Sequence, residues 1–406
     1  MRKPLSDIRV LDMSRILAGP WATQNLADLG AEVIKIEKPG VGDDTRHMGP
    51  PFLKDESTGQ PGDAAYFMCC NRGKKSITID FADARGQALI RQMVLQADVF
   101  VENYKVGALE KYGLDYQSLK AINPELIYCS ITGFGQTGPY KNRAGYDYLI
   151  QGMGGLMSVT GERDDLPGGG PQRVGVAVAD LMAGMYASVA ILAALHHRTM
   201  GHGGQHIDIS LLDSLVGSLV NQAQNYLVTG EAPKRMGSGH PNIAPYAVYP
   251  ASDGHLILAV GNDTQFRRLC SAIGHPEMGT DERFASIRAR VQNRVQLDEW
   301  LFPITRSRSV AEWVSLLEEA QVPGGPINDI QRVFQDPHVI ARGMRMDLPH
   351  AKYGSVPSVR NPMRFSETPL EFKTAPPQLG EHTDEVLRSM NLSPEEIAGL
   401  RDDGIL

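Results

Sequence analysis

The sequence predicts an α/β protein with a mostly parallel sheet, helices on both faces and a second, smaller α/β domain. Strand-like and helix-like runs alternate through the first part of the chain, which indicates βαβ units. Two stretches rich in proline and glycine, 237–254 and 322–329, interrupt the second half. They indicate an inserted domain, so we expect a large domain over 1–225 and 330–406 and a small one over 230–325.

Hydrophobic periodicity and the residues that end helices and strands predict the elements in order along the chain. Strands are expected at "IRVLDMS" (8–14), "EVIKIEKPG" (32–40), "KSITIDF" (75–81), "DVFVENY" (98–104) and "LIYCSITGFG" (126–135). Helices are expected at 19–31, 84–97 and 107–122. After an apolar helix near 180–195 come a short strand and a long helix ending at Gly230, then the strand "HLILAVGN" and helices to about 320.

The run "VGVAVADLMAGMYASVAILAAL" (174–195) contains a single charged side chain, Asp180. Its apolar part ends at His196 and His197 and is shorter than the ~20 residues that cross a bilayer, which favours a buried helix. Asp180 fits a helix N-cap. A poorly solvated carboxylate near a positive helix end can also be a nucleophile, so both interpretations stay open.

Composition excludes several classes of protein. The 406 residues carry a net charge of −7, which argues against a nucleic-acid-binding surface. Four cysteines without metal-ligand spacing and an N-terminus without a targeting pattern predict a reducing, cytoplasmic setting. The turn after the first strand is "SRILAGP", which lacks the G-x-G-x-x-G of dinucleotide sites. There is also no H-E-x-x-H, G-x-S-x-G or P-loop.

Basic residues gather in turns and loops next to strands, before one at "NRGKK" and after another at Lys38 and Arg46. "NRGKK" (71–75) has three cations around a glycine and fits either a solvated turn or a phosphate grip. Lys38, Arg46 and Lys111 could join it around a multiply phosphorylated cofactor. Three glycines in "GFGQTGPY" (133–140) permit a plain turn or a close approach of the backbone to a ligand.

Polar residues in two further loops have open roles. Tyr146 and Asp147 in "AGYDYL" are expected to make structural hydrogen bonds. His240 in "GSGHPNIAPY" is either a substrate contact or a surface residue.

Taken in order, seven segments resemble the class III CoA-transferases, the family of formyl-CoA and carnitine-CoA transferases. They are "LDMSRILAGPWATQNLADLGAEVIKIEKPGVGDDTR", "NRGKKSITIDF", "DVFVENY", "IYCSITGFGQTGPY", "AGYD", "GVAVADLMAG" and "QLGEHT". The resemblance covers nearly the whole chain. It implies a Rossmann-like large domain, a smaller domain and two chains interlocked as a homodimer.

The resemblance also implies a chemistry. In the family, the aspartate of the "ADLMAG"-like motif, here Asp180, attacks the thioester of an acyl-CoA. A mixed aspartyl anhydride and then an aspartyl-CoA thioester form before the acceptor acid collects the CoA. Acyl-CoA and a small carboxylic acid are then the substrates, with no tightly bound cofactor, no metal, no nucleic acid and no membrane.

Motif by motif, the resemblance assigns CoA contacts to Ile16, Lys38, Asn71, Arg72, Lys74, Lys75, Asn103 and Lys111. A second carboxylate on the substrate would need a cation or a hydrogen-bond donor. The candidate substrate contacts are Arg46, Tyr146, Arg173 and His240.

The chain departs from two branches of this family. Thr132 replaces a lysine of the formyl-CoA transferases, and "GSGHP" replaces their four glycines, which disfavours oxalate and formate. Tyr146 replaces the histidine with which the related α-methylacyl-CoA racemases move a proton, which favours transfer. The segments "GDDTRHMGPPF" and "SITGFGQTGP" look closest to the transferases of dicarboxylic acids such as succinate, glutarate and hydroxymethylglutarate. A racemase-like isomerase and a catalytically silent CoA-binding protein remain the alternatives.

Overall fold

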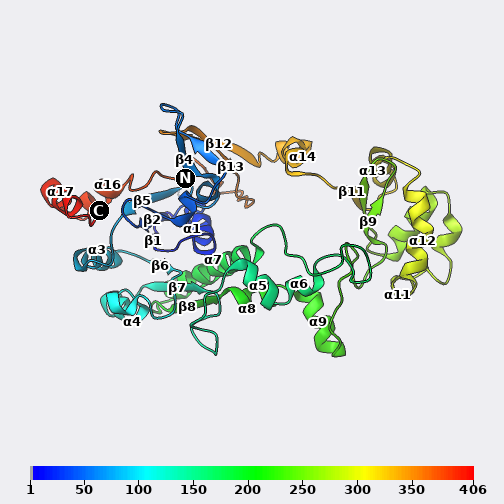
Figure 1. Ribbon diagram of the computed structural model, residues 1–406, viewed down its shortest axis with the longest axis horizontal. Helices are drawn as coiled ribbons and strands as arrows, with labels where there is room; N and C mark the ends of the chain where they lie inside the picture. Colours follow the sequence, from blue (N-terminus) through cyan, green and yellow to red (C-terminus); the bar gives the residue numbers. More distant parts are fainter. Residues whose placement is uncertain (1–2) are drawn as a thin grey trace. The chain divides into compact units, whose positions relative to one another are not determined.

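The computed structural model describes residues 3–406, which form two compact units (Figure 1). The larger unit contains the chain up to Leu156, then Val174–Gln224 and His338–Leu406. The smaller unit contains Met157–Arg173 and Asn225–Pro337. The smaller unit therefore takes in a segment before Arg173 that the sequence analysis assigned to the large domain.

A six-stranded sheet lies at the centre of the larger unit. Its strands are β1 (Arg9–Asp12), β2 (Glu32–Glu37), β5 (Lys74–Thr78), β6 (Val99–Glu102), β7 (Ile127–Thr132) and β8 (His206–Ser210). The spatial order is β5-β2-β1-β6-β7-β8 and every neighbouring pair is parallel. The strands other than β8 are mostly buried, because both faces of the sheet are covered. The order reverses between β1 and β6, where sheets of this kind bind ligands beyond the carboxyl ends of the strands.

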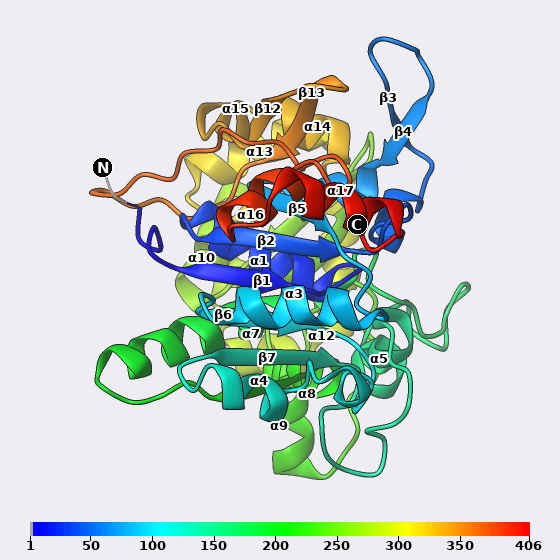
Figure 2. The same ribbon diagram turned by 90° about the vertical axis from the view of Figure 1, so that its left-hand side faces the viewer.

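Helices cover both faces of this sheet. On one face the core contains residues of α1 (Ala18–Asp28) and α7 (Val178–Thr199), with α5 (Asp147–Met153) and α8 (Leu211–Gly217) packed against α7. On the other face lie α3 (Ala84–Val94), α4 (Tyr116–Ile122), α16 (Thr383–Ser389) and α17 (Pro394–Asp402), which Figure 2 shows in front of the strands. The C-terminal helices thus complete the core around the first strands of the chain.

Shorter elements complete the larger unit. They are η1 (Asp44–Arg46), the pair β3 (Phe52–Lys54) and β4 (Pro61–Ala64), α2 (Ala65–Met68), η2 (Glu110–Tyr112) and the hairpin β12 (Arg345–His350) and β13 (Gly354–Val359). The helix α6 (Leu156–Val159) begins in the larger unit and continues into the smaller one, and α15 (Pro337–Ala341) begins at the last residue of the smaller unit. The helix α9 (Val220–Thr229) continues into the smaller unit.

The smaller unit is built around an antiparallel sheet of order β11-β10-β9. Its elements are β9 (Tyr246–Pro250), β10 (His255–Ala259), α10 (Asp263–Ala272), η3 (Pro276–Gly279), α11 (Ile287–Gln292), α12 (Arg294–Thr305), α13 (Val310–Glu319), β11 (Gly324–Pro326) and α14 (Ile330–Gln335). Large aromatic side chains fill its core, among them Tyr249, Phe266 and Trp313. The unit therefore has a hydrophobic core of its own.

The helix α7 differs from the prediction in two ways. It begins before Asp180, with Ala177 at the N-cap and no side-chain capping bond from that residue, so the N-cap interpretation of Asp180 is wrong. It is also 22 residues long with a mean hydropathy of 1.8, and among the described residues it alone has the length and composition of a membrane span. The length argument against a span therefore fails. Its packing against α1, β7 and β8 is what a core helix shows.

Candidate active site

Asp180 lies in the first turn of α7, and a side chain from α5 caps that turn. Asp147 accepts a hydrogen bond at Oδ1 from the Ala179 amide, at 2.8 Å. Gln151 Nε2 donates to Asp147 Oδ2 at 2.8 Å and to the Val176 carbonyl at 3.3 Å. The first amides of a helix have no partner inside the helix, so the Asp147 carboxylate satisfies one of them.

The surroundings of Asp180 disfavour its charge. Burial, followed by the negative charge of Asp147, raises the pKa of Asp180 to about 7, while a hydrogen bond from the Ala18 amide acts in the opposite direction. Burial and then the Asp180 carboxylate raise the pKa of Tyr66, at the end of α2, to about 12. Near neutral pH a substantial share of Asp180 is ionised, and the Tyr66 phenol is neutral and able to donate a hydrogen bond.

The loop between β1 and α1 lies at the switch point of the sheet and has an unusual backbone. Ile16 has a φ of 70°, in the left-handed region that a β-branched residue rarely adopts. Its amide donates to Asp43 Oδ1 at 3.2 Å. Asn103, directly after β6, accepts from the Arg15 amide at 2.8 Å and donates to the Arg15 carbonyl at 2.7 Å. Ile16 and Asn103, both predicted CoA contacts, are thus brought together in the loops that follow β1 and β6.

A charge network is buried beneath this loop. Three cations pair with three carboxylates, so the buried charges balance: Lys35 with Asp43 at 2.8 Å, Lys74 with Asp12 at 3.0 Å and Arg46 with Glu37 at 2.8 Å. Lys35 also donates to the Ser14 carbonyl at 2.8 Å, which fixes the start of the loop. Burial opposes ionisation of Asp12, but Lys74 and Lys35 outweigh it and lower its pKa to about 2.

This network changes the roles of two predicted ligands. Lys74 donates to the Pro20 carbonyl at 3.0 Å and to Asn71 Oδ1 at 2.8 Å besides pairing with Asp12, and burial lowers its pKa. Arg46 donates to Glu37 through two nitrogens and to Asp63 through the third, and its guanidinium lies 3.6 Å from the centre of the Phe67 ring. Both cations are fully buried and engaged within the fold. Both therefore have structural partners in the fold, and their contacts with CoA or substrate stay predictions.

The other residues of "NRGKK" are engaged as well. Arg72 forms two hydrogen bonds to Asp28, at 2.9 and 2.6 Å, and is buried. Asn71 is buried between the Phe67 carbonyl and Lys74. A phosphate would have to displace these partners to reach either side chain, and their contacts with CoA stay predictions.

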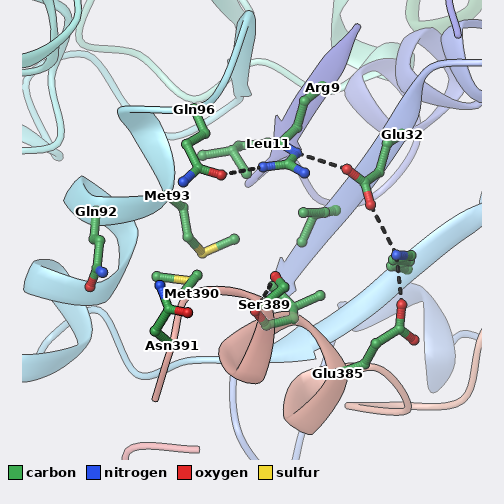
Figure 3. Close-up of a pocket in the computed structure, with 13 residues that line it drawn as sticks. Arg9, Leu11, Glu32, Gln92, Met93, Gln96, Glu385, Ser389, Met390 and Asn391 are labelled. Atoms are coloured by element: carbon green, nitrogen blue, oxygen red, sulfur yellow. Dashed lines mark hydrogen bonds and ion pairs between the residues drawn. The ribbon is translucent and has the colours of Figure 1, made fainter. Parts of the chain in front are cut away.

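Lys75 lies on the opposite face of the sheet from Lys74, because side chains alternate along a strand. It pairs with Glu32 at 2.9 Å and with Glu385 at 2.7 Å. Figure 3 shows the small pocket that these residues line, in which Arg9 bridges Glu32 and Gln96. The structure thus separates Lys75 from Ile16 and Asn103.

The remaining predicted contacts in the larger unit are exposed. Lys38 follows β2, and Lys111 lies in η2 with its ammonium 4.6 Å from the centre of the Tyr112 ring. Tyr146 directly precedes α5 and is 71% exposed. These three side chains are accessible to a ligand.

Arg173 and His240 belong to the smaller unit. Arg173 is exposed. His240 Nδ1 accepts the Asn242 amide at 3.1 Å, and burial together with the charge of Arg294 lowers the pKa of His240. The lowered pKa favours the neutral form of the His240 ring.

Sequence reasoning missed two members of the site, Tyr66 and the Ala18 amide. No motif marks Tyr66, which precedes the basic turn in a short helix. Asp147 was expected to make structural hydrogen bonds, and it makes them with the very turn that holds Asp180. Among residues 3–406 no cluster of three histidine, cysteine or acidic side chains could hold a metal ion.

Comparison with known proteins identifies this arrangement. The model of the family described as CoA-transferase family III matches residues 5–383. The chain belongs to this family. As a family III CoA-transferase it is an enzyme that uses an acyl-CoA as substrate.

Relatives of this CoA-transferase act on dicarboxylic acids. It is 51% identical over 389 residues to the succinate–glutarate CoA-transferase of Agrobacterium fabrum, covering 96% of both chains. It is 43% identical to the succinyl-CoA:glutarate CoA-transferase of Mus musculus, covering 96% of this chain and 86% of that one. A crystal structure of a CAIB/BAIF family protein from Brucella suis matches with a TM-score of 0.84 and 50% identity, covering 96% of this chain and 100% of the other. The family and the α/β architecture expected from the sequence are confirmed.

Proposed function

We propose that this enzyme moves CoA from succinyl-CoA, or from another dicarboxylic acyl-CoA, to a dicarboxylic acid through covalent intermediates on Asp180. The observation that supports the covalent role is the position of Asp180, in the first turn of α7 beside Asp147, Tyr66 and the Ala18 amide. A partly desolvated carboxylate whose pKa is about 7 is a stronger nucleophile than an ordinary aspartate. The names of the relatives support the dicarboxylic substrates.

The exchange is proposed to proceed through two kinds of intermediate. The Asp180 carboxylate attacks the thioester carbonyl, the carbon–sulfur bond breaks, and a mixed anhydride and the CoA thiolate form. The thiolate attacks the aspartyl carbonyl, which releases the donor as its free carboxylate and leaves an aspartyl-CoA thioester. The acceptor carboxylate repeats the first step on this thioester. The thiolate then attacks the acceptor's acyl carbon, which frees Asp180 again.

The neighbours of Asp180 can serve these steps. No proton has to be removed from an ionised carboxylate, so no general base is needed. The Ala18 amide and the Tyr66 hydroxyl are donors that could stabilise an oxyanion as it develops. The apolar surroundings of α7 limit the access of water, which would hydrolyse an anhydride.

The CoA is proposed to lie in the crevice between β1 and β6, which fits the ligand site of doubly wound sheets. Ile16 and Asn103 would line it, with the exposed ammonium groups of Lys38 and Lys111 near the phosphates. Tyr146, Arg173 and His240 remain the proposed contacts of the acid substrate.

A homodimer is part of the proposal. Large apolar side chains are exposed over α5, α7 and α8, namely Tyr148, Leu149, Met185, Tyr186, Val189 and Val216. Contiguous exposed apolar surface marks a protein interface, and a second copy of the chain would cover it. Light scattering after size exclusion would give twice the mass of 44.3 kDa if this is right. The interlocked form and a cytoplasmic location are carried over from the resemblance and the composition.

The experiment that tests the covalent step is a trapping measurement. The enzyme is incubated with succinyl-CoA, quenched in acid and digested, and the peptide that contains Asp180 is weighed. We expect the mass of a CoA or succinyl adduct, which is absent in Asp180→Asn and present in Asp213→Asn, a change of an exposed aspartate on α8. An unmodified Asp180 peptide alongside turnover would overturn the mechanism. Exchange of the α-proton with deuterated water, without consumption of an acceptor acid, would instead indicate an isomerase.

A further inference from the structure

We infer that Asp147 is a positioning residue for the transfer: it fastens the first turn of α7 and sets a fixed negative charge beside the Asp180 carboxylate. The inference rests on the proposed role of Asp180 as nucleophile. Asp147 lies in the "GYD" segment at the start of α5, whereas the reacting group lies on α7. The inference gives this side chain a function in the transfer.

Hydrogen bonds show how Asp147 fastens the turn. The residue at the N-cap of α7 is Ala177, which has no side-chain acceptor, so the capping bond comes from Asp147 to the Ala179 amide, at 2.8 Å. Ala179 is the residue directly before Asp180. A shift of Asp147 therefore moves the backbone that carries the nucleophile.

Gln151, one turn after Asp147 on α5, extends this attachment. Its amide nitrogen donates to Asp147 Oδ2 at 2.8 Å and to the Val176 carbonyl at 3.3 Å, and its oxygen accepts the Val174 amide at 2.9 Å. The two side chains of α5 thus hold the segment 174–179 at three backbone atoms, the Val174 and Ala179 amides and the Val176 carbonyl. Asp147 alone adds a charge to this attachment.

Both oxygens of Asp147 accept hydrogen bonds, which hold its carboxylate in place beside the first turn of α7. A fixed negative charge at this place disfavours ionisation of Asp180 and makes its carboxylate more basic. A more basic carboxylate attacks a thioester faster once it is ionised. Asp147 would therefore lower the fraction of Asp180 that is ionised and raise the reactivity of the ionised form.

The other groups that face Asp180 leave Asp147 as the source of this charge. α1 presents the Ala18 amide and α2 presents the neutral phenol of Tyr66. Further titratable groups on the elements packed against α7 do not contribute to the shift of the Asp180 pKa: Asp28, Tyr128, Cys129, His206, Asp208 and Asp213.

The test compares two charge-removing variants with two controls. Asp147→Asn removes the charge with little change of shape, and Asp147→Ser keeps a capping oxygen if the first variant fails to fold. Gln151→Ala loosens the attachment but leaves the charge. Asp213→Asn removes a charge from the exposed surface of α8. For each enzyme, kcat and kcat/KM for the exchange between succinyl-CoA and glutarate are measured from pH 5 to 9.

We expect the acidic limb of both rates to move to lower pH by about one unit in Asp147→Asn and Asp147→Ser, while the plateau at high pH falls roughly fivefold. The limb should stay in place in Gln151→Ala and Asp213→Asn. A limb that stays in place in both charge-removing variants overturns the inference. If wild-type Asp180 forms no adduct in the trapping measurement, the proposed function itself fails, so the two failures are distinguishable.

Discussion

The ammonium of Lys74 lies 3.0 Å from Asp12 Oδ2, and both side chains are fully buried beneath α1. A lysine that follows a glycine in a basic turn looks like a phosphate ligand in the sequence. In the fold it balances a carboxylate at the end of the first strand. Its contribution is to stability and to the shape of the loop above it.

We predict that Lys74→Met destabilises the protein by about 3–5 kcal/mol, because it leaves Asp12 buried without its partner. Urea unfolding followed by circular dichroism measures this loss. Lys75→Ala is the matched control, since its exposed pairs with Glu32 and Glu385 contribute at most about 1 kcal/mol. Equal effects of the two substitutions would contradict the buried network.

Asp180→Asn should abolish turnover and raise stability at alkaline pH. The folded-state pKa of Asp180 is about 7, against 3.8 for an ordinary aspartate, so the folded protein holds the extra proton between these values. The wild type therefore loses stability as pH rises from about 4 to 7, and the amide removes this loss. We expect a gain of roughly 1–3 kcal/mol at pH 8 and almost none below pH 4. Denaturant midpoints at pH 8 and pH 4 test the sign, and a uniform effect would contradict the pKa.

Asn103→Ala should raise the KM for the acyl-CoA more than it lowers kcat. The substitution removes both hydrogen bonds to the Arg15 backbone and lets the strained Ile16 loop relax away from the crevice. We expect an increase in KM of about tenfold, the equivalent of roughly 1.4 kcal/mol. Gln96→Ala removes a hydrogen bond from Arg9 at the start of β1 and serves as the control. An unchanged KM in Asn103→Ala would contradict the proposal that CoA binds beside this loop.

Gly184→Ala should damage both stability and catalysis. An added methyl group would lie 2.6 Å from the Ala18 carbonyl and 3.0 Å from Trp21 Cδ1, so α1 and α7 would have to separate. The Ala18 amide faces Asp180, and the separation would pull it away. We expect a loss of about 1–3 kcal/mol in thermal unfolding together with a lower kcat. Gly399→Ala, in the open surface of α17, should instead stabilise by up to about 1 kcal/mol.

Alternation of strands and helices was sufficient to predict the parallel sheet, because strands such as β6 and β7 are short, mainly apolar runs between clear breakers. Asp180 stood out as the single charge in the run 174–195, and the resemblance to the class III CoA-transferases gave it the role of nucleophile. Its exact place in the helix was not predictable, since the capping group comes from α5 through space and not from the neighbouring sequence.

The basic turn shows why the CoA site was harder to predict. Lys74 and Arg72 have acidic partners that are distant in sequence, Asp12 and Asp28, and local composition carries no record of such pairs. Tyr66 was missed for the same reason, because its proximity to α7 arises from tertiary packing. Lys38 and Lys111, which were also predicted as CoA contacts, have exposed side chains in the structure.

The C-terminal segment supplies carbonyl groups to two of the buried arginines: Pro377 accepts from Arg46 and Val359 accepts from Arg72. A ribosome adds these acceptors 331 and 287 residues after the arginines that they contact. During translation Arg46 and Arg72 therefore lack one hydrogen-bond acceptor each until the C-terminal segment has been made. A nascent chain that lacks these acceptors cannot form the native pairing. Chaperones would therefore have a long interval in which to bind it.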